Sequence, residues 1–296
     1  MVLFMHLIPL IIGPTCSGKT DFIIRLANHR SIEVISVDSV NCYKHLDIGS
    51  AKPSLAIRKS IAHHLIDIVQ PWESYSVGNF LKDIDPIIKQ ILDRGNLPVA
   101  VGGSMLYAHA LIHGIHEYPT IPGGIINQVK GDLERLGSHV IWDRLFICDP
   151  ETAGKIHKND KQRVERFYSL CLSENKTLKE IRTRRYQSSF QFKTYALANL
   201  SREMLYKKIN DRFDKMIEHG LVEEVRNIVK INDLEKKALH SIGYLQINQH
   251  LKGLISLNQA INEAKKESRH LAKRQLTWIR GWNNISFLKS GKEFLM

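Results

Sequence analysis

The stretch that decides the fold reads Gly13-Pro14-Thr15-Cys16-Ser17-Gly18-Lys19-Thr20. It matches G-x-x-x-x-G-K-[ST]; an apolar run over residues 7–12 precedes it and predicts a buried strand, and residues 21–28 after it predict a helix. In this context the pattern is typical of a phosphate-binding loop, whose backbone N–H groups and helix N-terminus form a cradle for anions. The sequence therefore predicts binding of a di- or triphosphate. The alternative is a chance glycine turn before an ordinary helix.

Two side chains of this loop have expected roles of their own. Lys19 is expected to reach a terminal phosphate oxygen as a point charge, and Thr20 to offer its hydroxyl to Mg²⁺. The motif alone leaves open which phosphate compound is bound, a nucleotide such as ATP included, and what reaction follows.

Strands and helices alternate around the loop, which predicts an α/β fold with a P-loop NTPase-like parallel sheet core flanked by helices. After Gly114 the alternation stops, and no convincing strand is predicted until residues 190–198. We therefore expect three parts: a first part of the core (1–116), an inserted all-helical domain (117–187), and a core completion with a basic helical C-terminal region (188–296). The expected inserted helices cover residues 125–136, 151–157, 160–173 and 177–185. Short strands are expected at residues 63–68 and 285–288, and long helices at 76–94, 201–219 and 258–281.

The charge is unevenly distributed along the chain. The 296 residues carry a formal net charge of +12, but residues 1–150 hold 13 Lys and Arg against 14 Asp and Glu, whereas residues 151–296 hold 29 against 16. A basic half attached to a phosphate-binding core indicates a polyanionic partner. A solvated basic surface that only favours solubility is the alternative.

The composition also indicates the cellular compartment in which the protein works. Its four cysteines are scattered and form no C-x-x-C pair, which argues against zinc and for reduced thiols in the cytoplasm. No apolar run is long enough to span a bilayer, so no membrane partner is expected.

Asp38 and Ser104 are the first candidates for chemistry. Asp38 ends the strand predicted over residues 33–37, and the carboxyl ends of parallel strands line the ligand crevice of such sheets. Its carboxylate could hold Mg²⁺ through water or accept a proton, or it could cap the segment that begins at Ser39. Ser104 follows Gly102-Gly103, where its hydroxyl could bind substrate or cap a helix. His63-His64 lacks metal-ligand partners, so packing or hydrogen bonding is expected there.

Two basic segments suit contacts with a nucleic acid. In Gln162-Arg163-Val164-Glu165-Arg166 the two arginines stand three residues apart and share a helix face, although a solvated face is equally consistent. Over residues 265–280 a basic stripe recurs at helical spacing, with Lys266, Arg269 or His270, Lys273 and Arg280. Leu271, Leu276, Trp278 and Ile279 are expected to dock this helix. Such a stripe is typical of a nucleic-acid interface, and chance surface charge is the alternative.

Taken together, the motifs resemble one family, the tRNA dimethylallyltransferases, also called tRNA isopentenyltransferases. Besides the phosphate loop, the resemblance rests on an ordered series of short motifs: Ile35-Ser36-Val37-Asp38-Ser39, Tyr43-Lys44, Asp47-Ile48-Gly49-Ser50-Ala51-Lys52-Pro53, His63-His64-Leu65-Ile66-Asp67, Tyr75-Ser76, Val101-Gly102-Gly103-Ser104-Met105-Leu106-Tyr107, Ile156-His157-Lys158-Asn159-Asp160, Gln162-Arg163, Gly243-Tyr244 and Lys273-Arg274-Gln275-Leu276-Thr277-Trp278-Ile279-Arg280-Gly281-Trp282. The phosphate loop alone is widespread, whereas the ordered set is specific.

The resemblance implies a reaction and roles for residues. A dimethylallyl group would pass from dimethylallyl diphosphate to the exocyclic amine of the adenine on the 3′ side of the anticodon, in tRNAs that read codons beginning with U. Asp38, Ser104 and Arg212 would be the catalytic residues: Asp38 accepts the amine proton, Ser104 positions the amine, and Arg212 binds the diphosphate together with residues 13–20. Thr20 would share Mg²⁺. The implied tRNA contacts, to the anticodon stem-loop, are Asp38, Ser39, Val40, Asn41, Ser104, Gln162, Arg163, Val164, Glu165, Arg166, Lys273, Arg274, Gln275, Thr277, Trp278 and Arg280.

The chain departs from the family pattern at several positions. Ser104 stands where Thr is usual, Asn41 replaces a usual Gln, and His240 and Leu245 replace basic residues. The family's C-terminal zinc finger, found in eukaryotic members, does not follow Trp282, which implies a bacterial-type enzyme. We expect the protein to act as a monomer.

Two other classes of function remain open at this point. A P-loop kinase or NTPase acting on a small molecule or nucleoside would use the same loop, but it leaves the basic half without a role. An RNA-binding protein with a structural phosphate loop would use the basic half but form no product.

Overall fold

The computed structural model describes residues 7–182 and 185–288. The chain divides into two compact units, one formed by Met1–His113 with Gln187–Met296 and the other by Gly114–Tyr186. The second unit begins three residues before the predicted insertion (117–187), because the short strand β5 (Ile115–His116) pairs within it.

In the part of the chain that the structure describes, the first unit contains a six-stranded sheet in the order β3-β2-β4-β1-β7-β8, with every neighbouring pair parallel. Its strands are β1 (Leu7–Ile12), β2 (Ile32–Val37), β3 (His63–His64), β4 (Leu97–Gly102), β7 (Gln191–Ala196) and β8 (Ile285–Phe287). All six residues of β2 and five of β1 are buried, as expected of central strands of a parallel sheet covered on both faces. The predicted fold class, a parallel core sheet flanked by helices, is confirmed.

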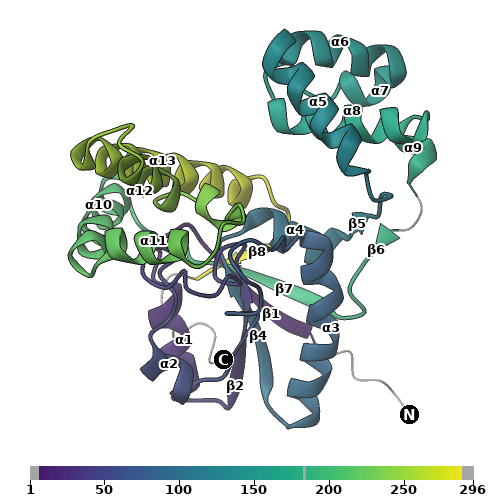
Figure 1. The fold of residues 1–296 in the computed structure, drawn as a ribbon. Helices are drawn as coiled ribbons and strands as arrows, with labels where there is room; N and C mark the ends of the chain where they lie inside the picture. The colour runs from purple at the N-terminus through teal and green to yellow at the C-terminus, as the bar shows by residue number, and fades with distance from the viewer. Residues whose placement is uncertain (1–6, 183–184, 289–296) are drawn as a thin grey trace, which may run out of the picture. The chain divides into compact units, whose positions relative to one another are not determined.

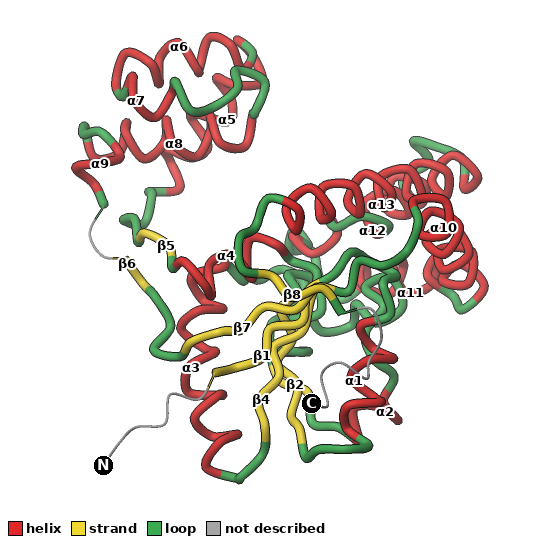
Figure 2. The backbone as a smooth tube through the Cα atoms, turned by 180° about the vertical axis from the view of Figure 1, so that it is seen from behind, coloured by secondary structure: helices red, strands yellow, loops and turns green. Residues whose placement is uncertain are grey.

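Helices cover both faces of this sheet (Figures 1 and 2). The helix α1 (Lys19–Ala27) packs Phe22, Ile23 and Leu26 against one face, and α2 (Leu55–Ser60) lies on the same side. On the other face lie α3 (Val77–Asp93), which is capped by Ser76, and α4 (Met105–His113). The loop after β1 therefore leads directly into a helix that is anchored in the core.

The C-terminal helices form one group, coloured green to yellow in Figure 1. They are α10 (Arg202–Glu218), α11 (Leu221–Lys230), the 3₁₀ helix η1 (Lys237–His240), α12 (Tyr244–Leu251) and α13 (Leu257–Arg280). Phe213, Leu221 and the fully buried Tyr244 share a core with Leu46 and Cys42 from the loop after β2. This shared core fixes the loop after β2 against α10 and α12.

The second unit has its own apolar core and is described by itself. It contains α5 (Gly123–Leu136), α6 (Ser138–Cys148), α7 (Pro150–Ala153), α8 (Lys161–Glu174), α9 (Leu178–Ile181) and β6 (Arg185–Tyr186). The sequence predicted neither α6 nor the antiparallel β5–β6 pair, and it extended the last helix to residue 185, whereas α9 ends at Ile181. Residues 183–184 of that predicted helix lie outside the described residues. A two-residue strand carries no periodic signal, so it is visible only through its pairing partner.

The predicted strand over residues 63–68 is limited to His63–His64. Leu65 and Asp67 adopt φ values of 61° and 57°, in the left-handed region, and this ends the strand. The two histidines make hydrogen bonds, His64 Nε2 to Glu33 Oε2 at 2.6 Å and His63 Nδ1 to the Ile61 carbonyl at 2.7 Å. Within the described residues no group of three or more His, Cys, Asp or Glu side chains could hold a metal ion.

The structure also bears on the cysteines and on the expected absence of a membrane span. All four cysteines are free thiols. Across residues 7–182 and 185–288, no helix combines the length and apolar character needed to cross a bilayer.

Candidate functional site

A cleft of about 950 Å³ opens at the carboxyl ends of β1, β2 and β4 in the first unit. Its walls come from segments far apart in the sequence, among them the phosphate loop, the turn after β2, the loop at residues 49–53, one face of α10, and α13. The predicted residues that line it are Thr15, Cys16, Ser17, Gly18, Lys19, Thr20, Asp38, Ser39, Val40, Asn41, Arg212 and Gln275. The structure therefore brings together the phosphate loop and Asp38, as the topology of a parallel sheet requires.

The two outer glycines of the phosphate loop are required by its geometry. A Cβ on Gly13 would lie 2.5 Å from Ser17 Oγ and 2.6 Å from the Leu197 carbonyl oxygen, so only glycine allows this close approach. Gly18 has φ of +88°, in the region that favours glycine. Among residues 7–182 and 185–288 the buried Ser17 Oγ has no hydrogen-bond partner, which leaves a donor available to an anion in the loop.

Lys19 lies inside the loop with its ammonium on backbone carbonyls. Nζ donates to the oxygens of Gly13 and Pro14, both at 2.9 Å. Burial lowers the pKa of Lys19 to about 8, although the negative charge of Asp38 opposes this shift. The charge is held at a desolvation cost that an anionic ligand would relieve.

Asp38 caps a turn with one carboxylate oxygen. Its Oδ1 accepts hydrogen bonds from the N–H groups of Val40 at 2.8 Å and Asn41 at 3.2 Å, and residues 39–42 form a turn rather than a helix. Burial raises the pKa of Asp38, against those two hydrogen bonds and the positive charges of Lys19 and Arg212. A carboxylate with a raised pKa is a stronger base, so the cap and the proton-acceptor interpretations are compatible in one side chain.

Ser104 contacts the residue next to Asp38. Its Oγ accepts from the Ser39 N–H at 2.9 Å and lies 3.2 Å from Ser39 Oγ, while its own N–H donates to the Val37 carbonyl at 3.2 Å. Ser104 thus fixes the backbone on both sides of Asp38.

Arg212 comes to the phosphate loop from α10. Its Nη2 donates to Thr15 Oγ1 at 2.6 Å. Lys208 and Lys215 line the same cleft from the same helix, at spacings of four and three residues from Arg212. Neither lysine was predicted from the sequence, although the spacing i, i+4, i+7 of three basic residues places them on one helix face.

Gln275 braces the phosphate loop from α13. Its Oε1 accepts from the Thr15 N–H at 2.9 Å, its Nε2 donates to the Gly103 carbonyl at 2.8 Å, and the residue is only 5% exposed. The resemblance implied a tRNA contact for Gln275, but the structure uses both ends of its amide within the protein.

Gln275→Met should therefore loosen the phosphate loop. It leaves the Thr15 N–H and the Gly103 carbonyl without their partner, which costs roughly 1–3 kcal/mol of stability for each group that stays buried and unpaired. We expect a lower melting temperature, measured by calorimetry, and weaker binding of inorganic diphosphate, measured by titration. Gln275→Glu keeps the acceptor for the Thr15 N–H, so its melting temperature and diphosphate affinity should lie between those of the wild type and of Gln275→Met. If Gln275→Met bound diphosphate as tightly as the wild type, Gln275 would not brace the loop.

A second carboxylate holds the loop at residues 47–50, part of the cleft wall. Glu224 of α11 accepts from the N–H groups of Asp47 at 3.0 Å, Ile48 at 2.7 Å and Gly49 at 3.1 Å, and from Tyr244 Oη at 2.7 Å. Three consecutive amides aimed at one carboxylate form an anion nest that the protein fills itself. No sequence motif marks Glu224, since its partners are backbone groups about 175 residues away.

The predicted contacts of the second unit lie at the start of α8. Gln162, Arg163 and Arg166 are exposed and Glu165 is partly buried, but Val164 is fully buried in the unit's own core. Its side chain serves packing and is not available to a nucleic acid.

Of the basic stripe predicted on α13, Lys266, His270, Lys273 and Arg280 are exposed. Lys265 pairs with Asp214 at 2.6 Å and Arg269 donates to Asn210 Oδ1 at 2.8 Å, so both turn toward α10. Lys273, Arg274, Thr277 and Arg280 are exposed. Trp278, which the spacing had placed on the docking side, is 37% exposed.

The donor set near the loop fits Mg²⁺. The exposed Thr20 hydroxyl stands at the start of α1, and Asp38 lies in the same cleft. Mg²⁺ keeps several waters and takes only one or two protein oxygens beside substrate phosphates, so the absence of a larger acidic cluster among the described residues is consistent with it.

The chain is similar to a family of known proteins. The family model for IPP transferase matches residues 41–282. The full-length tRNA isopentenylpyrophosphate transferase of Bacillus halodurans is 34% identical, with 95% of this chain and 89% of that one covered and a TM-score of 0.69. The tRNA delta(2)-isopentenylpyrophosphate transferase of Staphylococcus epidermidis is also 34% identical, with 98% and 96% covered and a TM-score of 0.67.

A third similar structure is that of a eukaryotic dimethylallyltransferase acting on tRNA, 28% identical over 95% of this chain and 73% of that one, with a TM-score of 0.75. A family model over most of the chain and one-third identity over nearly its whole length identify the chain as a transferase: it belongs to the IPP transferase family, the tRNA isopentenyl- and dimethylallyltransferases.

Proposed function

We propose that this enzyme transfers a dimethylallyl group from dimethylallyl diphosphate to the exocyclic amine of the adenine 3′-adjacent to the anticodon, in tRNAs that read codons beginning with U. The observation that carries the proposal is the cleft itself, which places a phosphate loop with two cationic side chains, Lys19 and Arg212, beside the basic carboxylate Asp38. An anion site next to a proton acceptor suits the displacement of a diphosphate by an amine.

The reaction needs three contributions, and the cleft offers a group for each. The allylic C–O bond to diphosphate breaks, so the leaving oxygen gains negative charge near Lys19, Arg212 and the loop amides. The adenine nitrogen forms the new N–C bond, and Asp38 takes the proton that this nitrogen loses. The cleft walls hold donor and acceptor in line, which removes much of the entropic cost of their encounter. When bound, Mg²⁺ held by Thr20 and the diphosphate would neutralise charge on the leaving group.

The adenine must leave its stack to reach a cleft inside the protein, so we expect it to be flipped out. Gln162, Arg163 and Arg166 of α8 and the exposed basic residues of α13 would contact the anticodon stem-loop through its backbone and shape. Asn41 lines the cleft, and its buried Oδ1, which has no hydrogen-bond partner within the described part of the chain, is an acceptor available for the flipped base.

One assay tests the proposal against its rivals. Purified enzyme is incubated with Mg²⁺, a tRNA that reads codons beginning with U, and dimethylallyl diphosphate labelled in the prenyl group, with ATP in a parallel tube. Label in the tRNA, located on the expected adenine by nuclease digestion and mass spectrometry, supports the proposal. Phosphate release from ATP without label in tRNA would instead favour a kinase or NTPase.

Diphosphate binding should take up a proton at Lys19. With a pKa of about 8, Lys19 is protonated below that pH and increasingly neutral above it, so diphosphate affinity should fall as the pH rises through this value. Bound diphosphate raises the pKa, because the ammonium gains an anionic partner. Calorimetry in two buffers of different ionisation enthalpy, at a pH above the pKa, should show the uptake in wild type and less in Lys19→Met; equal uptake in both would assign the proton elsewhere.

Neutralising the exposed cations of α13 should weaken tRNA binding through electrostatics. For Lys273→Gln with Arg274→Gln we expect a shallower dependence of log Kd on log salt, by roughly 0.7–0.9 for each phosphate that the variant no longer neutralises. The measurement is a filter-binding or anisotropy titration at several salt concentrations. Lys59→Gln with Lys89→Gln, two exposed lysines on α2 and α3, removes the same charge elsewhere and should keep the wild-type slope. An unchanged slope in the α13 variant would mean that this face meets only solvent.

A further inference from the structure

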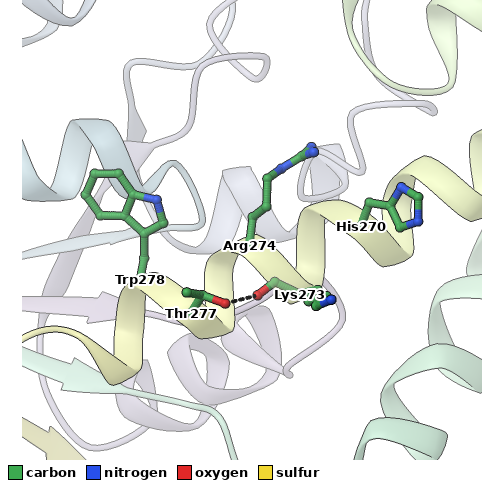
Figure 3. Close-up of a pocket in the computed structure, with 5 residues that line it drawn as sticks. All are labelled: His270, Lys273, Arg274, Thr277 and Trp278. Atoms are coloured by element: carbon green, nitrogen blue, oxygen red, sulfur yellow. Dashed lines mark hydrogen bonds between the residues drawn. The ribbon is translucent and has the colours of Figure 1, made fainter. Parts of the chain in front are cut away.

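A second hollow adjoins the cleft in the first unit and shares with it the wall formed by Ala51 and Pro53. Its volume is about 760 Å³, within the range of roughly 300–1,000 Å³ that is typical of sites for small molecules. It has no lining residue in common with the hollow on α13 drawn in Figure 3, whose lining residues are mostly predicted tRNA contacts. We call it the Lys44 hollow, because Lys44 lines it and does not line the cleft.

The charges around the Lys44 hollow are unequal in number, with five Lys or Arg side chains against two aspartates. Both aspartates are already paired. Asp67 accepts hydrogen bonds from Lys52 Nζ and Arg58 Nη1, each at 2.5 Å, and Asp47 accepts from the same Lys52 Nζ at 2.9 Å. The Lys52 side chain is only 1% exposed, so this network belongs to the framework of the hollow and leaves no free carboxylate in it.

Two ammonium groups of the hollow are free. Lys44 is partly buried and Lys215 is exposed on α10, and neither makes an ion pair or a side-chain hydrogen bond among residues 7–182 and 185–288. A third cation, Arg212, is held on the phosphate loop by its hydrogen bond to Thr15. Free cations without a nearby free carboxylate favour an anionic ligand.

Much of the remaining lining of the hollow is aliphatic. Ile48, Leu55 and Met216 line it beside Ala51 and Pro53, and Leu55 is 67% exposed at the first position of α2. No Phe, Tyr or Trp lines the hollow, so it has no aromatic surface on which a nucleobase could stack. An aliphatic chain would cover this surface, because burial of apolar area is favourable whatever the shape of the chain.

We propose that the Lys44 hollow binds a second diphosphate ester, an isoprenyl or alkyl diphosphate whose chain is longer than a dimethylallyl group. Lys44 and Lys215 would pair with the diphosphate, and Ile48, Leu55 and Met216 would contact the chain. The hollow is large enough for such a chain, and its cations and aliphatic wall match the two ends of the molecule. The inference does not rest on the proposed reaction, since its site is separate from the phosphate loop.

The test is a calorimetric titration with geranyl diphosphate, with inorganic diphosphate present at a concentration that saturates the phosphate loop. Wild type should bind one geranyl diphosphate per chain under this condition. Lys44→Gln should lower the affinity by roughly tenfold or more, as for loss of a hydrogen bond to a charged group. Leu55→Asp should lower it by a similar factor, because it puts a negative charge beside the chain, and an acidic residue in the first turn of a helix is compatible with folding.

Matched controls remove the same groups from other surfaces. Lys89→Gln changes an exposed lysine on α3, and Leu254→Asp changes a leucine that is 69% exposed and does not line the hollow. Both should bind geranyl diphosphate as wild type does. Thermal melting of all four variants separates a folding defect from loss of the ligand.

A series of chain lengths supplies the second measurement. From dimethylallyl to geranyl to farnesyl diphosphate, the affinity of the hollow should rise by roughly fourfold for each further CH₂ group that it buries. In Leu55→Asp this dependence on chain length should be weaker than in wild type.

Three results would overturn the inference: no geranyl diphosphate bound once the phosphate loop is saturated, wild-type binding by both Lys44→Gln and Leu55→Asp, or an affinity that does not change with chain length. The proposed function fails by a different readout, namely the absence of prenyl label in tRNA, which these titrations do not measure.

Discussion

Asp38→Asn is expected to reduce turnover by roughly 10²–10⁴-fold, the contribution typical of a positioned general base. The substitution keeps an oxygen in the place of Oδ1, which accepts from the N–H groups of Val40 and Asn41, so the turn should survive. In the proposed reaction it removes the group that would take the proton from the adenine amine. Single-turnover kinetics with preformed enzyme–tRNA complex should show the loss in the chemical step, with tRNA affinity little changed.

Asp38→Ala separates the two roles of the carboxylate. It removes the base and the cap together, so it should add a stability loss of about 1 kcal/mol, typical of removing a capping side chain, to the same loss of turnover. Rate and stability are thus measured on both variants. If the Asp38→Asn variant supports wild-type turnover while only the alanine variant is impaired, Asp38 is a cap and another group takes the proton.

The acid side of the pH profile provides an independent check. Burial raises the pKa of Asp38, so the protonated, inactive carboxyl persists to a higher pH than for an ordinary aspartate. The rate should therefore fall as the pH is lowered through that raised pKa, and Asp38→Asn should have no such limb.

Lys19→Met should lower kcat/KM for dimethylallyl diphosphate by roughly 10²–10³-fold, as for loss of one preorganised group that stabilises developing charge. The ammonium acts on the ground state through the bound diphosphate and more strongly on the leaving group, so KM should rise and kcat should fall. Lys19→Arg should not restore activity, because the larger guanidinium cannot take the place of a compact ammonium between the Gly13 and Pro14 carbonyls. A variant with normal kcat and raised KM would limit Lys19 to binding.

The free energy of unfolding should depend on the protonation of Lys19 in the opposite direction to diphosphate affinity: it should rise with pH, whereas the affinity falls. Between pH 8 and 10.5 the unfolded chain still carries the proton that folded Lys19 has lost, so the free energy of unfolding of the wild type should rise with pH in this window. Lys19→Met lacks this rise. Urea titrations of both proteins at pH 8 and at pH 10.5 measure how the free energy of unfolding changes with pH in each. The same change in both proteins would mean that burial does not lower the pKa of Lys19.

The sequence was sufficient where a local pattern determines the structure. One arrangement, a strand followed by a phosphate loop and a helix, satisfies the patterns of the apolar run at Leu7–Ile12, the glycine-rich turn and the residues after it. The core sheet and the position of Lys19 were therefore predictable. Asp38 followed from topology, since strands of a parallel sheet end at the same edge. The helices predicted to begin at Ser76 and Ser201 do begin there, each capped by that serine, because a capping hydrogen bond reaches only three residues along the chain.

What escaped prediction depends on distant partners. Gln275 belongs by sequence to a basic stripe, and only the approach of the phosphate loop, 260 residues away in the chain, turns it into a brace. Val164 stands between exposed polar residues of a motif but faces the core of its own unit. The strand β6 exists because Ile115–His116 offers it a partner. In each case tertiary contacts outweigh the local signal.

The carboxylate of Glu224 has a consequence for where a diphosphate can settle. Being part of the chain, it competes for the amides of residues 47–49 at an effective concentration that no dissolved anion reaches. The cleft wall thus contains two sets of backbone amides suited to an anion, the phosphate loop and residues 47–49, and Glu224 occupies the second set. For the proposed substrate, the amides of residues 47–49 are therefore already occupied, and its diphosphate would be held by the amides of the glycine-rich turn.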